Sequence, residues 1–513
     1  MSIRLFSSAI SGIDAQLIEV EVDSSKGLHS FSIVGLPDKA VQESIDRIAS
    51  SIRNSNLFPH SSKNKKIIVN LAPADIKKEG PSYDLPIAIG YLLESGQIKF
   101  DPSGIVFAGE LSLDGSLKHT SGMLATALLA KELGFSEVII PHSNAKEASI
   151  VSGVRVIGAK TMLEVISHLD GTNVIKPFEY SEADVEDSSD QDLAIFHIKG
   201  QEMAKRAMTI AAAGSHNILM SGPPGSGKTI LAKSLVGLLP PLSFDEAVEV
   251  AKIYSSMGLI RDAGLSFQRP FRSPHHTTSA PAVVGGGTSP RPGEISLAHR
   301  GVLFLDEMPE FPRSVLESLR QPMEEGMITV SRASGTIILP AKFMLVGAMN
   351  PCACGNFGDD RHQCTCMPQS VIRYRKKISG PLLDRIDIQI NVPRGTLDDK
   401  PTLENSSDSG LQMRNNIKLA REMQNNRYRG RKIYSNSELS YKNIDEFCHL
   451  TSSAESLLRS ALAAKGLSLR SYHKIKKIAQ TIADIEQSEE IGENHVAEAL
   501  SLRINEKMFS EVF

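Results

Sequence analysis

The centre of the chain carries the stretch that decides its fold, Gly222-Pro223-Pro224-Gly225-Ser226-Gly227-Lys228-Thr229. Residues 218–220 before it are apolar and residues 230–235 after it have a helical pattern, which predicts a strand, a glycine loop and a helix. Glycines let backbone N–H groups turn inward around phosphate oxygens, and the start of the helix adds a positive dipole end. We therefore expect this loop to bind a nucleoside triphosphate, with Lys228 on the β- and γ-phosphates and the Thr229 hydroxyl on Mg²⁺.

A second apolar run, residues 301–305, ends in two carboxylates, Asp306 and Glu307. Unpaired carboxylates at the tip of a buried strand are costly, and a bound Mg²⁺ would offset that cost. Asp306 is then expected to serve the metal, directly or through water, and Glu307 to polarise the attacking water. The alternative is a strand followed by a solvated Asp-Glu turn.

A third apolar run, residues 343–349, ends at Asn350, whose amide can orient the same water. Farther along, Arg385 follows a Leu-Leu-Asp sequence. It can form a structural salt bridge with Asp384 or Asp387, or it can reach the γ-phosphate bound by a neighbouring subunit, where its delocalised charge would stabilise the transition state.

Composition excludes several classes of protein. The chain has 513 residues and a formal net charge of −3, so three domains are expected and any nucleic-acid site must be a local patch. We find no apolar run of membrane-spanning length and no secretory pattern at the start, and therefore expect a cytoplasmic protein. Five cysteines in such a protein argue against a disulfide framework.

Two polar stretches divide the chain. Residues 179–192 hold seven acidic and no basic residues, which is typical of a solvated linker, and a second polar stretch has the same character. The expected division is a mixed α/β domain at 1–175, an acidic linker at 176–194, an ATPase core at 195–395, a polar linker at 396–410 and a helical domain at 411–513.

Four of the cysteines, Cys352, Cys354, Cys364 and Cys366, form a C-x-C-x9-C-x-C pattern directly after Asn350. Two thiolate pairs joined by a short loop suit a tetrahedral, structural Zn²⁺ site. C-x-C is tighter than the commoner C-x2-C, and His362 is a possible substitute ligand. Four reduced loop thiols are the alternative.

These motifs, in this order, resemble an AAA+ ATPase. The segments 271–276, 293–299 and 379–385 resemble the magnesium-chelatase-like branch, and the whole chain is similar to the ComM/YifB family. The resemblance implies ATP and Mg²⁺ as ligands, assembly into a ring that is usually a hexamer, and a helicase activity that drives DNA branch migration during recombination and natural transformation.

The same resemblance assigns roles by position. Lys228 and Thr229 fall in Walker A, and Asp306 and Glu307 fall in Walker B. Asn350 matches sensor 1, Arg385 the arginine finger and Arg470 sensor 2, with the subunit on which Arg470 acts left open.

Residues 78–82 and 109–113 resemble a Lon-type serine-lysine protease domain, with Ser82 at the position of the nucleophile. Leu124 occupies the position of the activating lysine, so we expect no peptidase activity. The expected fold class is therefore α/β: a Lon-protease-like (ribosomal S5-type) N-terminal domain, an AAA+ parallel-sheet core and a helical C-terminal lid.

The expected partner is DNA, single-stranded or branched. A hairpin at residues 326–340 would place Arg332 near its tip, where it could hold a phosphate or remain a solvated arginine, and the basic stretch at 427–432 slightly favours DNA. The alternative is a chelatase-type remodeller that acts on a protein partner.

Overall fold

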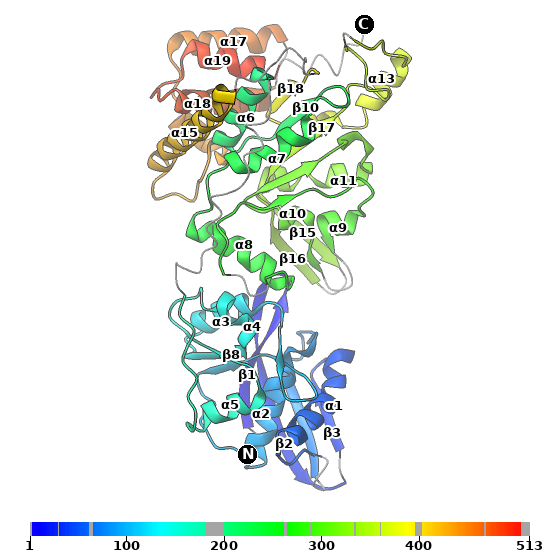
Figure 1. Ribbon diagram of the computed structural model, residues 1–513, viewed down its shortest axis with the longest axis vertical. Helices are drawn as coiled ribbons and strands as arrows, with labels where there is room; N and C mark the ends of the chain where they lie inside the picture. Colours follow the sequence, from blue (N-terminus) through cyan, green and yellow to red (C-terminus); the bar gives the residue numbers. More distant parts are fainter. Residues whose placement is uncertain are drawn as a thin grey trace.

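The computed structural model describes residues 3–28, 30–60, 65–180, 200–260, 264–286, 290–332, 335–359, 361–394, 403–465 and 468–503. The molecule has three parts: an N-terminal α/β part at one end of its long axis, a second α/β part around the glycine loop, and a helical part beside the far end of the second part (Figure 1). The fold class expected from the sequence is confirmed. The acidic stretch at 181–194 and residues 396–402 lie outside the described residues.

The N-terminal part is built on a seven-stranded mixed sheet of order β3-β4-β2-β1-β5-β8-β9. Strand β4 shows why these residues form strands, because its buried Ile67, Val69 and Leu71 alternate with less buried neighbours. The strands are β1 (Ile3–Ser11), β2 (Asp14–Lys26), β3 (Ser30–Val34), β4 (Lys65–Ala72), β5 (Ile105–Phe107), β8 (Glu137–Pro141) and β9 (Arg155–Ala159), with a small β6–β7 pair (Glu110–Leu111, Leu117–Lys118). The helices are α1 (Lys39–Asn54), α2 (Asp84–Glu94), α3 (Met123–Glu132), α4 (His142–Ala148) and α5 (Met162–Leu169).

The central part contains a five-stranded parallel sheet of order β11-β14-β17-β10-β18. Its strands are β11 (Phe271–Arg272), β14 (Val302–Leu305), β17 (Met344–Met349), β10 (Ile218–Ser221) and β18 (Ile388–Asn391). The neighbouring helices are α6 (Glu202–Gly214), α7 (Lys228–Leu238), α8 (Phe244–Ser256), α9 (Ala280–Val284), α10 (Glu294–Leu297), α11 (Arg313–Ser318), α12 (Pro322–Glu325), α13 (Pro368–Arg375) and α14 (Gly380–Leu383). The strands are almost wholly buried, as parallel strands covered on both faces must be.

The expected hairpin is present as β15 (Met327–Arg332) and β16 (Gly335–Pro340), which pair antiparallel. The turn at 333–334 and the Arg332 side chain lie outside what the structure describes. A β12–β13 pair (Gly285–Gly286, Arg291–Pro292) accompanies α9.

The helical part consists of α15 (Leu403–Arg427), α16 (Tyr441–Phe447), α17 (Ser452–Lys465), α18 (Leu469–Ile485) and α19 (Glu493–Ser501). The apolar stripe of α18, Ile475, Ile478, Ala479 and Ile482, is fully buried. Helix α15 already begins at Leu403, within the stretch expected to be a polar linker at 396–410. The later part of α15 is anchored by buried residues that include Ile417 and Ala420. Because helix formation propagates from an existing helix, the polar residues before them can continue it.

The N-terminal part rests on the central part at two places. Gly122 N–H, at the start of α3, donates to the Ser255 carbonyl of α8 over 2.8 Å. The β1–β2 turn packs against the hairpin, since Ile13 shares an apolar cluster with Ile328. A Cβ on Gly12, whose φ is +67°, would lie 2.5 Å from Ile337 Cγ2, so this contact requires glycine. No described helix is both long enough and apolar enough to cross a membrane.

Candidate active site

The glycine loop joins strand β10 to helix α7, as the sequence predicts. Gly227 precedes the helix with a φ of +87°, a left-handed conformation that glycine adopts without strain. Gly222 lies close to the backbone just after strand β18, and a Cβ on Gly222 would lie 2.2 Å from the Val392 carbonyl oxygen. The backbone of the loop is therefore free to approach a phosphate group at the N-terminus of α7.

Lys228 is folded back onto this loop. Its ammonium donates to the carbonyl oxygens of Gly222 at 2.7 Å and Pro223 at 2.9 Å, and reaches the side-chain oxygen of Asn350 at 3.4 Å. Burial lowers the pKa of Lys228 to about 8, and the charge of Asp306 partly opposes that shift. The structure thus brings the expected Walker A lysine and the expected sensor 1 amide together.

Asp306 and Thr229 also meet. The Thr229 hydroxyl donates to Asp306 Oδ2 over 2.8 Å, although 77 residues separate them in the chain. The contact follows from the parallel sheet, because β14 and β10 both lie beside β17 and end at the same edge. A hydroxyl and a carboxylate are hard oxygen ligands, so this pair fits a Mg²⁺ ion held beside a triphosphate.

Glu307 has a left-handed backbone conformation, which is uncommon for a residue other than glycine. Its φ is +49°, and its N–H donates to Asp306 Oδ1 over 2.9 Å. Its side chain is 56% exposed, and His276 Nδ1 lies 3.7 Å from its Oε2. Sequence reasoning assigned no role to His276. Its place shortly after β11, the strand beside β14, is the signal that could have found it.

Arg272 at the end of β11 forms a bidentate ion pair with Glu294 of α10, with distances of 2.6 and 2.7 Å. This pair joins two of the segments on which the family resemblance rests, 271–276 and 293–299. It fixes the start of the loop that carries His276.

Arg385 and Arg470 lie elsewhere, and they lie together. Arg385 Nη2 is 2.7 Å from Glu324 Oε1, and its Nη1 donates to the Pro381 carbonyl over 2.7 Å. The Arg470 guanidinium contacts the same Glu324 oxygen and lies 3.7 Å from Asp384 Oδ2. Within the described ranges, neither arginine is paired with a residue of the phosphate loop.

The site residues therefore form two groups. Lys228, Thr229, Asp306 and Asn350 make one, with Glu307 adjacent, and Arg385 and Arg470 make the other. Sequence reasoning also missed Glu324, because no motif or regular spacing connects it to either arginine.

Comparison with known proteins agrees with this geometry. Three family models match the chain: magnesium chelatase subunit ChlI at residues 194–399, subunit ChlI of Mg-chelatase at 20–144, and the ChlI C-terminal region at 407–503. The chain is 44% identical to competence protein ComM of Haemophilus influenzae, over 97% of each chain. It is 42% identical to protein YifB of Escherichia coli, over 98% of this chain and 96% of that protein.

The chain belongs to the ComM/YifB family. Because this is a magnesium-chelatase-like AAA+ family, the chain is an ATPase. The chain is also similar to Lon protease 2 of Bacillus subtilis, with 29% identity over 30% of this chain and 29% of that one.

In this family member the four clustered cysteines meet in space. The sulfur of Cys352 lies 3.3 Å from that of Cys354 and 3.7 Å from that of Cys364, and all four ligand atoms lie within 4.8 Å of one another. A compact group of four sulfurs is the donor set of a tetrahedral Zn²⁺ site. His362 is exposed and is not part of the group.

The cysteine loop packs on the phosphate loop. Gly355 has a φ of +83°, and a Cβ there would lie 2.6 Å from Pro224 Cδ. The guanidinium of Arg375 donates to the Pro351 carbonyl over 3.1 Å and stacks on Phe357. Any ion held by the four sulfurs would thus stiffen a segment in direct contact with the ATP site.

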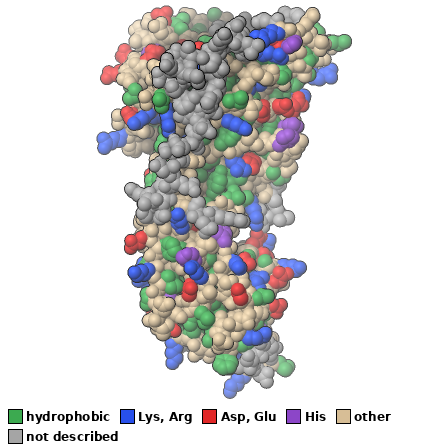
Figure 2. All heavy atoms as spheres, viewed as in Figure 1, with side chains coloured by type: hydrophobic (Ala, Val, Ile, Leu, Met, Phe, Trp, Pro, Cys, Tyr) green, Lys and Arg blue, Asp and Glu red, His purple; other side chains and the backbone are tan. Residues whose placement is uncertain are grey.

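Two of the four basic residues in the stretch at 427–432 are paired within the chain, whereas Arg429 and Lys432 are exposed. Arg427 is bound through both terminal nitrogens to the buried carboxylate of Asp484, and Arg431 is paired with Glu446. A charge already neutralised by a buried carboxylate is not available to a phosphate. On the face shown in Figure 2, basic side chains lie among acidic ones and do not gather in one patch.

At Ser82 the backbone carbonyl accepts from Gly109 N–H over 2.8 Å, so the two Lon-like segments do meet. No hydrogen bond joins the Ser82 hydroxyl to a lysine among the described residues, and Leu124 is fully buried in α3. The absence of peptidase activity stays a prediction.

Proposed function

We propose that the chain is one subunit of a hexameric ring. This ring would hydrolyse ATP to move DNA. The reaction would be of the helicase or branch-migration type, on single-stranded or branched DNA. The similarity to a protein named for competence supports a place in DNA recombination and natural transformation.

The observation that carries this proposal is the 2.8 Å contact between Thr229 and Asp306, beside Lys228 and Asn350. When bound, Mg²⁺ would neutralise charge on the triphosphate, and Thr229 and Asp306 are the residues that would hold it. Glu307 accepts a proton from the attacking water, Asn350 orients that water, and Lys228 leaves the loop carbonyls to bind phosphate.

The positions of Arg385 and Arg470 support the proposal that subunits assemble into a ring. In one subunit Glu324 holds Arg385 and Arg470, and the phosphate loop has no paired guanidinium among the described residues. A neighbouring subunit that presents this surface to the phosphate loop would supply the missing cation. Head-to-tail contacts of this kind close into rings.

We also propose that Cys352, Cys354, Cys364 and Cys366 hold a structural Zn²⁺. Elemental analysis of the purified chain should find one zinc per subunit, lost when Cys364 and Cys366 are both replaced by Ser. A chain free of zinc, copper and iron would contradict the proposal.

A chelatase-type remodeller acting on a protein partner is the second candidate, since the family models that match are those of magnesium chelatase. ATP hydrolysis measured with and without DNA separates the two. The DNA motor predicts stimulation by branched or single-stranded DNA that falls steeply with salt. Hydrolysis that DNA leaves unchanged at low salt would favour the remodeller.

The catalytic assignment has its own test. Glu307→Gln keeps the shape of the side chain but removes the base, so kcat should fall by at least ~100-fold while the Kd for ATP stays the same. Glu310→Gln, in the next turn of the same segment, is the matched control. Hydrolysis at the wild-type rate by the Glu307 variant would remove Glu307 from the mechanism.

A further inference from the structure

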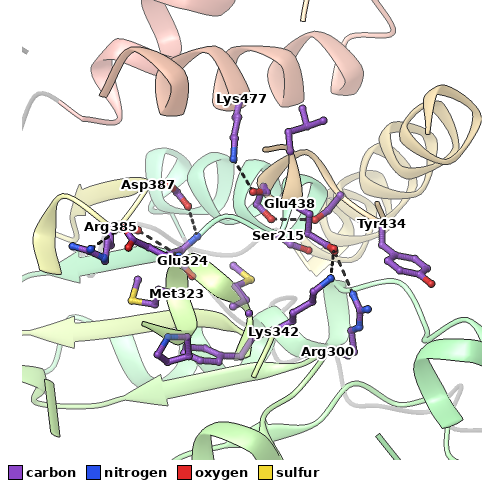
Figure 3. Close-up of a pocket in the computed structure, with 18 of the residues that line it drawn as sticks. Ser215, Arg300, Met323, Glu324, Lys342, Arg385, Asp387, Tyr434, Glu438 and Lys477 are labelled. Atoms are coloured by element: carbon purple, nitrogen blue, oxygen red, sulfur yellow. Dashed lines mark hydrogen bonds and ion pairs between the residues drawn. The ribbon is translucent and has the colours of Figure 1, made fainter. Parts of the chain in front are cut away.

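A pocket of about 600 Å³ lies between the central sheet and the helical part, away from the phosphate loop. Its lining carries nine lysines or arginines against five carboxylates, so positive charge is in excess. Figure 3 shows labelled lining residues contributed by several elements, with Lys477 pointing inward from α18. An excess of cations around a partly enclosed space is costly unless counter-charge enters it.

Most of these cations have a carboxylate partner in the chain. Glu438 accepts from Lys342 at 3.1 Å and from Arg300 at 3.4 Å, as the dashed lines in Figure 3 mark. Lys474 is paired with Asp387 at 2.8 Å. These pairs form the neutralised part of the wall.

Lys477 and Arg421 are different. The Lys477 ammonium donates to the Ser437 carbonyl over 2.9 Å. The Arg421 guanidinium, in a side chain that is only 7% exposed, donates to the carbonyls of Tyr434 and Ala212 and to the Ser215 hydroxyl. Throughout the part of the chain that the structure describes, neither side chain has a carboxylate within 4.0 Å.

Carbonyl oxygens accept hydrogen bonds but do not neutralise a charge. Burial accordingly lowers the pKa of Lys477 to about 8 and that of Arg421 to about 10. Two spare N–H groups of Lys477 and the exposed ammonium of Lys432, which lines the same pocket, remain available to a ligand.

We propose that this pocket binds a small phosphate-bearing anion, with Lys477 as its contact inside the pocket, Lys432 as a second contact and Arg421 as the buried charge that attracts it. The volume accommodates a di- or triphosphate and is in the range of small-molecule sites. The anion comes either free from solution or from a neighbouring subunit, because Arg385 and Arg470 line the same pocket. The proposal itself requires neither DNA nor ATP hydrolysis.

The first test measures pyrophosphate binding by calorimetry to the full chain carrying Lys228→Ala, in which the phosphate loop has lost its lysine. Binding is expected, and adding Lys477→Met should weaken it at least ~10-fold, since one charged contact in a buried site is lost. Lys418→Met, on an exposed face of α15 outside the pocket, is the matched control and should leave the Kd unchanged. Binding that Lys477→Met leaves unchanged overturns the proposal, and no binding at all overturns the free anion as its source.

The second test does not depend on a Lys477 variant. Acetylation of Lys477 at pH 8, followed by mass spectrometry, should slow several-fold when the anion occupies the pocket, while Lys418 reacts at a constant rate. Protection by pyrophosphate in dilute Lys228→Ala chain identifies a free anion as the source. Protection seen only in concentrated wild-type protein with a non-hydrolysable ATP analogue identifies the neighbour's triphosphate. No protection in either arm overturns the proposal.

Discussion

The two halves of the candidate site differ in how complete they are within one chain. The half around the phosphate loop is assembled, with Lys228 against Asn350 and Thr229 against Asp306. The half that carries Arg385 and Arg470 is assembled too, but around Glu324. Among the described residues, the phosphate-loop half has no paired guanidinium, whereas the other half holds two guanidiniums on one carboxylate.

This difference has a physical origin. Neighbouring parallel strands deliver Thr229, Asp306 and Asn350 to one edge of one sheet, and no second molecule is needed. Arg385 and Arg470 come from α14's C-terminal side and from the first turn of α18, where the nearest carboxylate is Glu324 of α12. This difference is the basis of our proposal that a nucleotide held by one chain is completed by the arginine surface of another.

The largest effect, on the rate of ATP hydrolysis, should come from removing Arg385, the arginine that we propose acts on a nucleotide bound by a neighbouring subunit. Arg385→Ala should lower the kcat for ATP roughly 10³-fold, the magnitude usual for a finger arginine, because the transition-state charge loses its partner. The Kd for ATP, set by the other half, should stay within about twofold. Steady-state hydrolysis and fluorescent-nucleotide binding measure the two quantities.

Arg459→Ala, on the exposed surface of α17, removes an arginine that pairs only within its own helix and serves as control. If the Arg385 variant lost affinity and not turnover, the division of labour between the two halves would be wrong.

A smaller effect should follow from pH, and only at the phosphate-loop half. The pKa of Lys228 is about 8 in the free chain because of burial, and bound phosphate raises it. Binding then takes up a proton above pH 8, so affinity is constant below that value and weakens up to ~10-fold per pH unit above it.

The Kd for ATP, measured between pH 7 and pH 9.5, gives this profile directly. Lys228→Arg should bind more weakly but with a flat profile, since a guanidinium does not titrate in this range. A flat wild-type profile would show that the lysine is not desolvated as described.

The smallest effect should come from the cysteine loop. Gly355→Ala places a methyl group against Pro224, so the phosphate loop must shift, and the Kd for ATP should rise about 3- to 10-fold. Gly358→Ala is a close control, because Gly358 also has a positive φ (+75°) but its Cβ would meet nothing within 4 Å. Equal Kd values for the two variants would mean that this loop does not support the ATP site.

Sequence reasoning reached the phosphate-loop half because its signals are local. Eight consecutive residues specify the loop, and acids or an amide directly after apolar runs mark the ends of neighbouring strands. The cluster of four cysteines could be predicted in the same way, since all four fall within 15 residues of the sequence.

The arginine half could not be derived in the same way. Glu324 lies 61 residues before Arg385 and 146 before Arg470, and their meeting depends on how the helical part packs on the sheet. The pairing of Arg427 could not be derived for the same reason, because Asp484, which neutralises Arg427, is supplied by another helix. A basic residue in a sequence does not reveal which distant carboxylate will pair with it in the folded chain.

The most direct test of a shared site mixes two inactive chains. Lys228→Ala lacks a working phosphate-loop half but keeps Arg385, and Arg385→Ala lacks the arginine but keeps the loop. If neighbouring subunits complete one site, an equimolar mixture should hydrolyse ATP well above the sum of the separate rates, because some interfaces then combine two intact halves. A mixture that never exceeds that sum, under conditions where the two variants demonstrably co-assemble, would contradict the account.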